Sequence, residues 1–236
     1  MRPRLRETLL VAVVLACSMP PTISASGSPT QLLASILAAA RAERSVHYAT
    51  AGRYGVVRVS FVGDAGVTRG IQRITYRKDT RTGHVRVIVS ANTAYVYGDA
   101  FTLVNYMGFT AAQASKYGRV WILIPRADSG YSTVAAGVNL SSTINELKLS
   151  GQLSIVPDTK IGGQRVFGVR AKKTSSSGHR TVDTLYARAA GAPLPVKEIA
   201  SQGTMRLTAT FGRWNEPIHV ATPTAPVPIS VVRKTH

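Results

Sequence analysis

The sequence predicts an α+β fold in which a long antiparallel β-sheet curls into a half-barrel around helices. Over most of the chain, apolar residues alternate with arginines or small polar residues, at the two-residue period of a half-buried strand. Between residues 99 and 150 the alternation stops and apolar residues recur at helical spacing. Because a sheet of about ten strands twists and curls, we expect these helices to cover its single apolar face from the concave side.

A first helix is expected at the start of the folded domain. Ser28 is suited to be an N-cap, and Pro29 occupies the first helical position, where proline is favoured. Up to about Arg44, apolar residues then recur at helical spacing, namely Leu32, Leu33, Ile36, Leu37 and Ala40. This apolar stripe needs a sheet to pack against.

From Val46 onwards the period changes to two. Early strands are expected near residues 57–61, 73–77, 85–90 and 94–97, with glycine-containing turns that indicate antiparallel hairpins. One strand is expected inside the helical segment, at residues 119–124. The strand pattern then resumes near residues 151–156, 164–173, 181–189, 195–201, 204–213 and 218–221. No linker divides this series, so we expect one domain over residues 28–227 and a basic C-terminal tail over residues 228–236.

The N-terminus has the features of an export signal. Residues 2–6 contain three arginines, and the apolar run at residues 9–16 is less than half the roughly 20 residues that span a bilayer. We expect residues 1–16 to be a signal peptide and residues 17–27 a flexible tether. Cys17 is the only cysteine, so the exported domain has no intrachain disulfide.

Two interpretations of Cys17 remain open from the sequence. The tetrad Val14–Cys17 resembles a bacterial lipobox, in which case Cys17 carries a diacylglycerol and anchors the mature chain to the outer face of the cell membrane. Alternatively, cleavage after Ala25 or Ser26 removes Cys17 and releases a soluble, secreted protein. Both interpretations place the folded domain outside the cytoplasm.

The chain carries a formal net charge of +18 at pH 7. Its basic residues are dispersed, and an exported protein meets anionic lipids and wall polymers rather than nucleic acid. We therefore expect no nucleic-acid partner. Within the strands, the arginines alternate with apolar residues and should lie on the convex face: Arg58, Arg73, Arg86, Arg170 and Arg206.

No arrangement of residues predicts an enzyme. Serines 175–177 lie close to His179 and Asp183, but they fall in a glycine-containing turn and no nucleophile elbow accompanies them. The histidines lack the spacing of a zinc site, and the few acidic residues are scattered. We expect no catalytic residue, no metal and no cofactor.

Several segments form an ordered series: AYVYGDA at residues 94–100, ASKYGRVW at 114–121, KIGGQRV at 160–166, TLY followed by PLPVK at 184–197, and FGRWNEPI at 211–218. Their order and spacing resemble the actinobacterial lipoprotein family typified by LppX and LprG, which shares the half-barrel of the lipoprotein carrier LolA. The resemblance covers about residues 28–227. It implies a cavity between sheet and helices that holds an acylated lipid, and it brings no catalytic residues.

Apolar residues of the strands and of the helical insert are expected to face one another inside the half-barrel. Short, alanine-rich helices fill a curled sheet poorly, so we expect a cavity of roughly a few hundred cubic ångströms between them. The strand residues expected to line this cavity are Val59, Phe61, Ile74, Tyr76, Val87 and Phe167, and the insert residues are Leu103, Met107, Tyr131, Val134 and Ile144.

The leading hypothesis is a non-catalytic, monomeric carrier of an acylated envelope lipid or glycolipid, which also meets the membrane surface through its N-terminal anchor. A second hypothesis is a sensor or protein-interaction module of the same fold. A third is an electrostatic binder of anionic wall polymer through the convex arginines. Retention of extractable acyl chains would favour the first, and steep salt dependence would favour the third.

Overall fold

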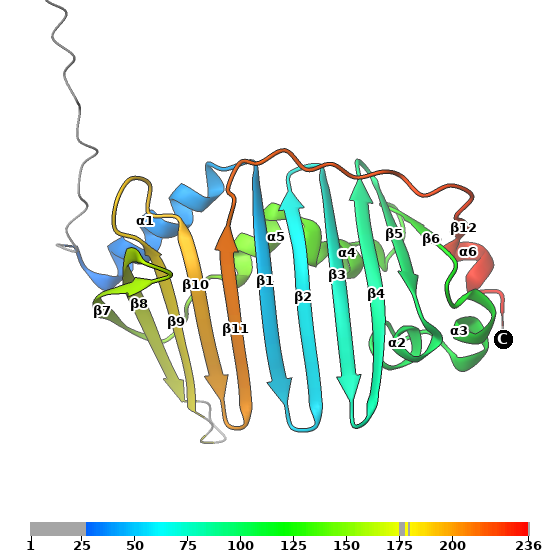
Figure 1. Cartoon of the computed structure of the whole chain (residues 1–236), viewed down its shortest axis with the longest axis horizontal. Coiled ribbons are helices and arrows are strands. Elements are labelled where there is room, and N and C mark those ends of the chain that lie inside the picture. Colours follow the sequence, from blue (N-terminus) through cyan, green and yellow to red (C-terminus); the bar gives the residue numbers. More distant parts are fainter. Residues whose placement is uncertain (1–26, 175–177, 179, 236) are drawn as a thin grey trace, which may run out of the picture.

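The computed structural model describes residues 27–174, 178 and 180–235. The expected signal peptide, Cys17 and nearly all of the expected tether lie outside these residues. Within them, the strands form one open sheet in the order β12-β6-β5-β4-β3-β2-β1-β11-β10-β9-β8-β7 (Figure 1). The strands are β1 (Ser45–Tyr54), β2 (Val57–Gly66), β3 (Arg69–Lys78), β4 (Arg81–Ser90), β5 (Thr93–Gly98), β6 (Ile122–Pro125), β7 (Gln152–Ile161), β8 (Gln164–Thr174), β9 (Arg180–Arg188), β10 (Pro195–Gln202), β11 (Met205–Gly212) and β12 (Val227–Pro228).

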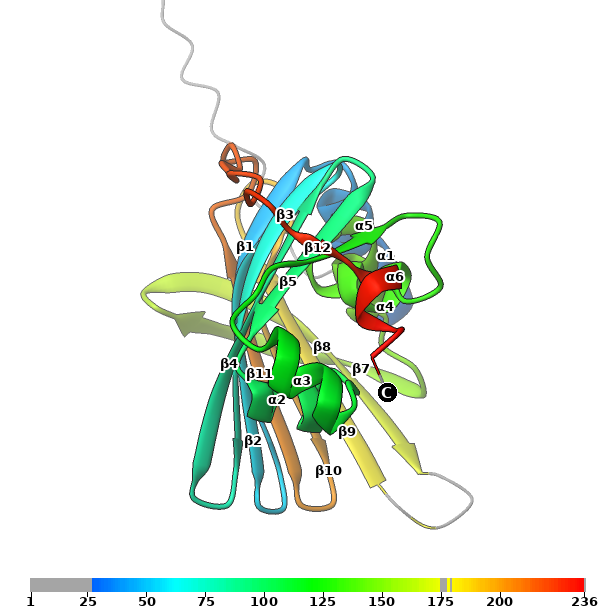
Figure 2. The same ribbon diagram turned by 90° about the vertical axis from the view of Figure 1, so that its right-hand side faces the viewer.

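Helices lie on the concave side of this sheet (Figure 2). One precedes the sheet, several belong to the insert between β5 and β7, and one follows β12. The helices are α1 (Pro29–Arg41), α2 (Ala100–Asn105), α3 (Ala111–Tyr117), α4 (Tyr131–Ala135), the 3-10 helix η1 (Ala136–Val138), α5 (Leu140–Glu146) and α6 (Ile229–Val232). The open α+β half-barrel confirms the predicted fold class.

Helix α1 begins as the sequence predicts. The Ser28 hydroxyl accepts a hydrogen bond from the Gln31 N–H (3.2 Å), and the Gln31 side chain accepts one from the Ser28 N–H (2.9 Å). This capping box satisfies two N–H groups that the first helical turn leaves without a partner. The apolar stripe of the helix is buried, and its residues are those expected: Leu32, Leu33, Ile36, Leu37 and Ala40.

Hairpins build the two halves of the sheet, and β1 joins them by pairing antiparallel with both β2 and β11. The expected strand at residues 218–221 is absent, which corrects the prediction. Pro217 and Pro223 flank that segment, and proline cannot donate a ladder hydrogen bond. The chain instead runs along one end of the sheet after β11 and reaches β12, which pairs parallel with β6 (Figure 1).

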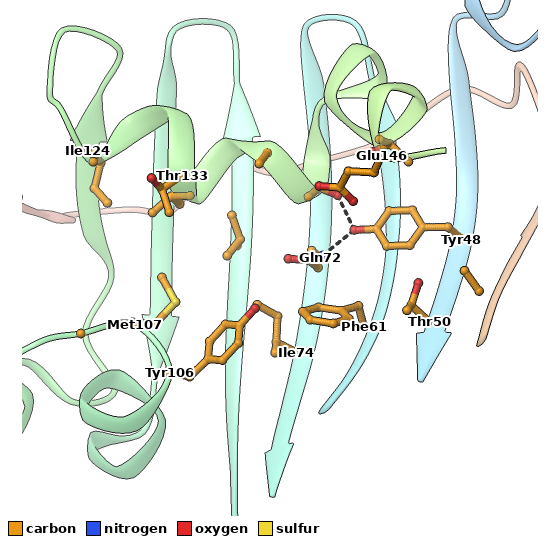
Figure 3. Close-up of a pocket in the computed structure, with 18 of the residues that line it drawn as sticks. Tyr48, Thr50, Phe61, Gln72, Ile74, Tyr106, Met107, Ile124, Thr133 and Glu146 are labelled. Atoms are coloured by element: carbon orange, nitrogen blue, oxygen red, sulfur yellow. Dashed lines mark hydrogen bonds between the residues drawn. The ribbon is translucent and has the colours of Figure 1, made fainter. Parts of the chain in front are cut away.

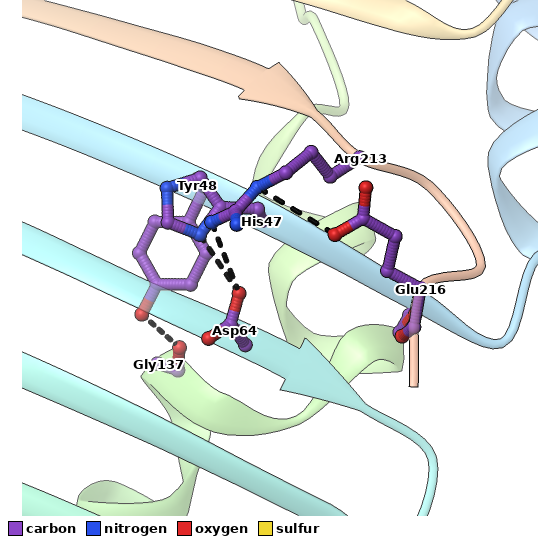
Figure 4. Close-up of polar contacts among 7 residues, drawn as sticks. His47, Tyr48, Asp64, Gly137, Arg213 and Glu216 are labelled. Carbon is purple, nitrogen blue, oxygen red and sulfur yellow. Dashed lines mark hydrogen bonds and ion pairs between the residues drawn. The ribbon is translucent and has the colours of Figure 1, made fainter. Parts of the chain in front are cut away.

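Polar contacts hold the start of this returning segment against β1 and β2 (Figure 4). The His47 ring lies 2.7 Å from the Asp64 carboxylate, and the Arg213 guanidinium lies 3.8 Å from the same carboxylate and 3.8 Å from that of Glu216. The backbone N–H of Asn215 also donates to the Ser45 carbonyl (3.1 Å). These contacts fix the direction in which the segment leaves β11.

The C-terminal residues do not form the expected basic tail. In α6, Ile229 is 7% exposed and Val232 is fully buried, and both belong to the core beneath β4–β6. The Arg233 guanidinium forms two contacts with the Asp128 carboxylate, at 2.5 and 2.7 Å. Residues 228–235 therefore cover the β6–β12 edge of the half-barrel (Figure 1).

The core has two parts. Beneath α1 and α5, the inward side chains of β1, β8 and β9 are close-packed, and Phe167 and Leu185 at its centre are almost completely buried. Beneath α2, α3, α4 and α6, a second cluster is built on β3–β6 around Val87, Val96 and Ile122. Between the two clusters the concave face is not filled.

The convex face carries the arginines as predicted. Arg58, Arg73, Arg86 and Arg206 are exposed, whereas Arg170 is half-buried and donates to the Thr184 hydroxyl (3.3 Å). At one edge of the sheet, β7 pairs only with β8, and its register shifts between Val156 and Thr159, at Pro157. No helix among the described residues is long and apolar enough to cross a bilayer.

Candidate functional site

A cavity of about 810 Å³ occupies the unfilled part of the concave face (Figure 3). Its floor is formed by inward residues of β1–β4, β6, β10 and β11. Its roof comes from the loop between α2 and α3, from α4, η1 and α5, and from α6. The cavity is within the range of volumes that bind small ligands.

The side of the cavity beneath α4 and α6 is largely apolar. Here Met107 and Phe109 from the α2–α3 loop face Ile124 of β6, with Val134 of α4 and Ile229 of α6 beside them. These side chains offer apolar surface that hydrocarbon chains would cover favourably. The ion pair of Asp128 and Arg233, which also borders the cavity, is internally compensated, and Arg233 lowers the pKa of Asp128.

The opposite side of the cavity, toward β1 and β10, is polar (Figure 3). The Gln72 amide donates to the Tyr48 hydroxyl (2.6 Å), and that hydroxyl donates to the carbonyl of Gly137 in η1. Burial is the largest cause that raises the pKa of Tyr48, so the hydroxyl stays protonated at physiological pH. This chain of hydrogen bonds ties the sheet to the roof of the cavity.

Carboxyl groups gather at this polar side. The pKa of Glu198 is raised to about 7, mainly by burial and also by the neighbouring carboxylates of Asp183 and Glu146. Burial also raises the pKa of Glu146 and of Asp183. Both Glu198 and Glu146 line the cavity. In the register of the sheet, Ala209 of β11 lies between Glu198 of β10 and Thr50 of β1. The polar side thus presents hydrogen-bond acceptors.

Aromatic rings stand where β2 and β3 meet helix α2. The Tyr106 ring centroid lies 6.3 Å from that of Phe61 and 5.7 Å from that of Tyr76. Phe101 lies 5.9 Å from Tyr76, and the guanidinium of Arg81 lies 4.4 Å from the centre of the Phe101 ring. Of these rings, Phe61 and Tyr106 line the cavity, and Tyr106 is 38% exposed, so these two form one wall of the cavity where it meets solvent.

The structure divides the residues that the sequence predicts for the cavity. The side chains that line it are Phe61, Ile74, Val87, Met107 and Val134. Leu103 of α2, Ile144 of α5 and Phe167 of β8 lie in the close-packed core instead, because their side chains are packed between helix and sheet. The remaining three lie beside the cavity without lining it: Val59, Tyr76 and Tyr131.

Sequence reasoning missed the polar residues of the cavity. Tyr48, Gln72 and Glu198 each occupy an inward strand position, and Gln72 shares the inward face of β3 with Ile74. A polar residue at an inward position was therefore the available signal. No group of three or more His, Cys, Asp or Glu within the described part of the chain is placed to hold a metal ion.

The similarity of this chain to known proteins lies in its fold and not in its sequence. No family model matches the sequence, and no curated protein matches it. LprF from Mycobacterium bovis superposes with a TM-score of 0.55 and 14% identity, over 84% of this chain and 99% of that structure. The Mycobacterium tuberculosis lipoprotein LppX superposes with a TM-score of 0.50 and 16% identity, over 81% of this chain and 99% of that structure.

These likenesses concern the arrangement of the main chain. Both structures are covered almost completely, so the match includes the whole half-barrel and not a single hairpin. At 14% and 16% identity, the likeness carries no residue of either protein over to this chain. The predicted resemblance is thereby confirmed at the level of fold, and the chain has the half-barrel of the LppX and LprF lipoproteins.

Proposed function

We propose that this protein is a non-catalytic carrier of an amphiphilic lipid of the cell envelope. The observation that supports this most strongly is the cavity of about 810 Å³, with an apolar side formed by Met107, Phe109 and Ile124 and a polar side at Glu198. Hydrocarbon chains would cover the apolar side, and the head group would face the acceptors. The likeness in fold to the lipoprotein LppX agrees with this proposal.

The polar side favours a head group that donates hydrogen bonds, such as the hydroxyls of a sugar. Glu198 and Glu146 supply carboxyl oxygens, and a phosphate placed beside them would meet like charge once they ionise. The cavity's one arginine, Arg233, is already engaged by Asp128 in two contacts. We therefore propose a neutral glycolipid in preference to a phosphate-bearing lipid.

Mass spectrometry of the lipids that the protein retains tests this proposal. The mature chain with Cys17→Ser, secreted from an actinobacterial host, would be purified without detergent and extracted with organic solvent. The substitution removes acyl chains attached to the anchor, so any acylated species comes from the cavity. We expect about one neutral, acylated glycolipid per chain. A phosphate-bearing lipid would contradict the head-group assignment alone, and the absence of lipid would contradict the carrier and favour an interaction module.

We also propose that Cys17 is lipidated and holds the domain at the outer face of the cell membrane. The lipobox-like tetrad Val14–Cys17 directly after the apolar run supports this. Cys17→Ser should move the protein from the membrane fraction to the soluble or secreted fraction and change its electrophoretic mobility. Unchanged fractionation and mobility would show that the signal is cleaved further along, after Ala25 or Ser26.

A further inference from the structure

The β1–β2 hairpin carries the most exposed large apolar side chains of the described residues. Tyr54 is 70% exposed and Val56 is 66% exposed, on either side of Gly55 at the tip. The tips of β1–β2, β3–β4 and β10–β11 all lie at the same end of the sheet (Figure 1). Two large apolar side chains exposed together at one tip offer an apolar contact surface to a partner.

Arginines form a row across the strands at this end. In the register of the sheet, Arg206 pairs with Arg53, Arg53 with Arg58, and Arg58 with Arg77. All four are exposed. Like charges directly opposite each other on adjacent strands destabilise a sheet, so the row has an energetic cost that an anionic partner would offset.

Hydrogen bonds direct three of these arginines toward the tips. Arg53 donates to the carbonyl of Gly55 (3.4 Å), Arg77 to that of Asp79 (3.3 Å), and Arg206 to that of Gly203 (2.8 Å). Each of these carbonyls belongs to the turn of its own hairpin. The guanidinium groups therefore lie near the turns, at the level of Tyr54 and Val56.

We call these residues the hairpin rim: Arg53, Tyr54, Val56, Arg58, Arg77, Lys78, Arg81 and Arg206. Lys78 pairs with Arg81 in the β3–β4 ladder, which brings a further two cations to the tips. Asp79 is the only acidic residue in these three turns. None of the ion pairs found among the described residues includes a rim residue.

The opposite end of the sheet has a different charge pattern. Asp64 and Glu216 lie there and form ion pairs with His47 and Arg213 (Figure 4). The turn between β2 and β3 exposes an apolar residue, Val67, to 64%, but no row of arginines flanks it. Among the described residues, unpaired arginines and two neighbouring exposed apolar side chains thus coincide at the rim.

We propose that the hairpin rim is a docking surface for an anionic lipid bilayer. The arginines would contact lipid phosphates while Tyr54 and Val56 enter the interface, where an amphipathic ring and an apolar side chain are favoured. Thr50, which lines the cavity, precedes Tyr54 by four positions on β1, about 13 Å at the rise of a strand. Docking at the rim would bring the cavity close to the head groups.

Vesicle binding tests the charge requirement. The chain carrying Cys17→Ser would be mixed with vesicles of phosphatidylglycerol and phosphatidylcholine, or of phosphatidylcholine alone, and sedimented. We expect binding to the anionic vesicles. Replacing Arg53, Arg58, Arg77 and Arg206 with glutamine should weaken it about a hundredfold. The matched control replaces Arg73 and Arg86, which pair with each other on the convex face away from the tips, and should lose far less. An equal loss per arginine in both variants would overturn the rim assignment.

Penetration of the rim distinguishes a bilayer from a soluble polyanion. With Cys17 replaced by Ser the chain has no cysteine, so Tyr54→Cys and the control Val67→Cys each give one site for an environment-sensitive fluorophore. We expect a blue shift at position 54 on anionic vesicles and none at position 67. The double substitution of Tyr54 and Val56 by serine should weaken vesicle binding about tenfold. An unshifted signal at position 54, or full binding by the double variant, would overturn docking and indicate a polyanion-binding surface instead.

Discussion

The two halves of the concave face differ in how far helices fill them. Helix α1 has 13 residues and buries a continuous apolar stripe against β8 and its neighbours, so Phe167 is only 1% exposed. The α-helices of the insert have between 5 and 7 residues each and η1 has 3, and they leave about 810 Å³ above the sheet. One inward face of one sheet is thus a close-packed core under a long helix, whereas under the short helices a packed cluster and a cavity lie side by side.

Helix length explains this difference physically. A helix of several turns presents side chains to the sheet at regular intervals, and these can interdigitate with the strand residues. Short helices joined by loops must turn away before they cover much surface, and their polar termini need partners such as the Asp99, Thr110 and Asn139 caps. The insert therefore packs against β3–β6 but leaves part of the space above the sheet unfilled.

Truncation of an inward phenylalanine would test the comparison most strongly. Phe167→Ala removes a ring from the close-packed half and should lower the free energy of unfolding by about 3–5 kcal/mol. Met107→Ala, in the wall of the cavity, should cost far less because its side chain already borders open space. Urea denaturation of both variants measures the two values. Equal losses would mean that the halves are packed alike.

The hydrogen bonds that join sheet and roof should contribute next most. Tyr48→Phe deletes the hydroxyl that accepts from Gln72 and donates to Gly137, leaving buried polar groups without a partner. We expect a loss of about 1–3 kcal/mol in the free energy of unfolding. Thr50→Val, at the neighbouring inward position of β1, is the matched control because Thr50 takes no part in that chain. An unchanged free energy of unfolding in the Tyr48→Phe variant would show that water replaces the contact.

The polar side of the cavity should make stability depend on pH. The pKa of Glu198 is raised to about 7 from an ordinary 4.5, so the folded state holds a proton that the unfolded state releases. Its stabilising contribution is complete below about pH 4.5 and is lost as the pH rises through 7. Thermal unfolding at pH 5.5 and pH 8 should show this slope in the wild type. Glu198→Gln should reduce it, and an identical slope in both proteins would remove Glu198 as its source.

A substitution that fills the cavity should have the smallest effect on stability and a large effect on the ligand. Val134→Trp places an indole next to the open space, so we expect a change in the free energy of unfolding smaller than the roughly 1–3 kcal/mol of an overpacked core. Bound lipid, measured by mass spectrometry, should fall. Val138→Trp is the control, since Val138 is 1% exposed in the packed cluster. Strong destabilisation by both substitutions would contradict the presence of open space beside Val134.

The strands could be predicted from sequence because their signal is local. Alternation of Arg58, Arg73 and Arg86 with apolar residues gave their faces correctly, and turn residues gave the hairpins. A strand was wrongly predicted at residues 218–221 because apolar residues alternate there, although Pro217 and Pro223 prevent pairing. Its real path, along the end of the sheet, depends on contacts such as Asn215 with Ser45 that no local pattern records.

The cavity was harder to predict because burial is decided by distant parts of the chain. Phe61 and Phe167 are both inward phenylalanines on strands, yet Phe61 lines the cavity and Phe167 lies in the core. Only the position of α1, more than a hundred residues away in sequence from Phe167, distinguishes them. Glu198 was not among the residues predicted for the cavity, and its inward position follows from the register of β10 with β11.

The register shift in β7 bears on self-association. An open sheet has two free edges, and a long, regular edge strand invites a second chain to extend the ladder. Pro157 removes one N–H from this edge, and Asp158, which pairs with Arg165 at 2.7 Å, adds charge at the same place. At the other edge, β12 has two residues, and one is Pro228. Neither edge offers a continuous template for intermolecular β-sheet, which protects an open half-barrel from fibrillar aggregation where chains are crowded together.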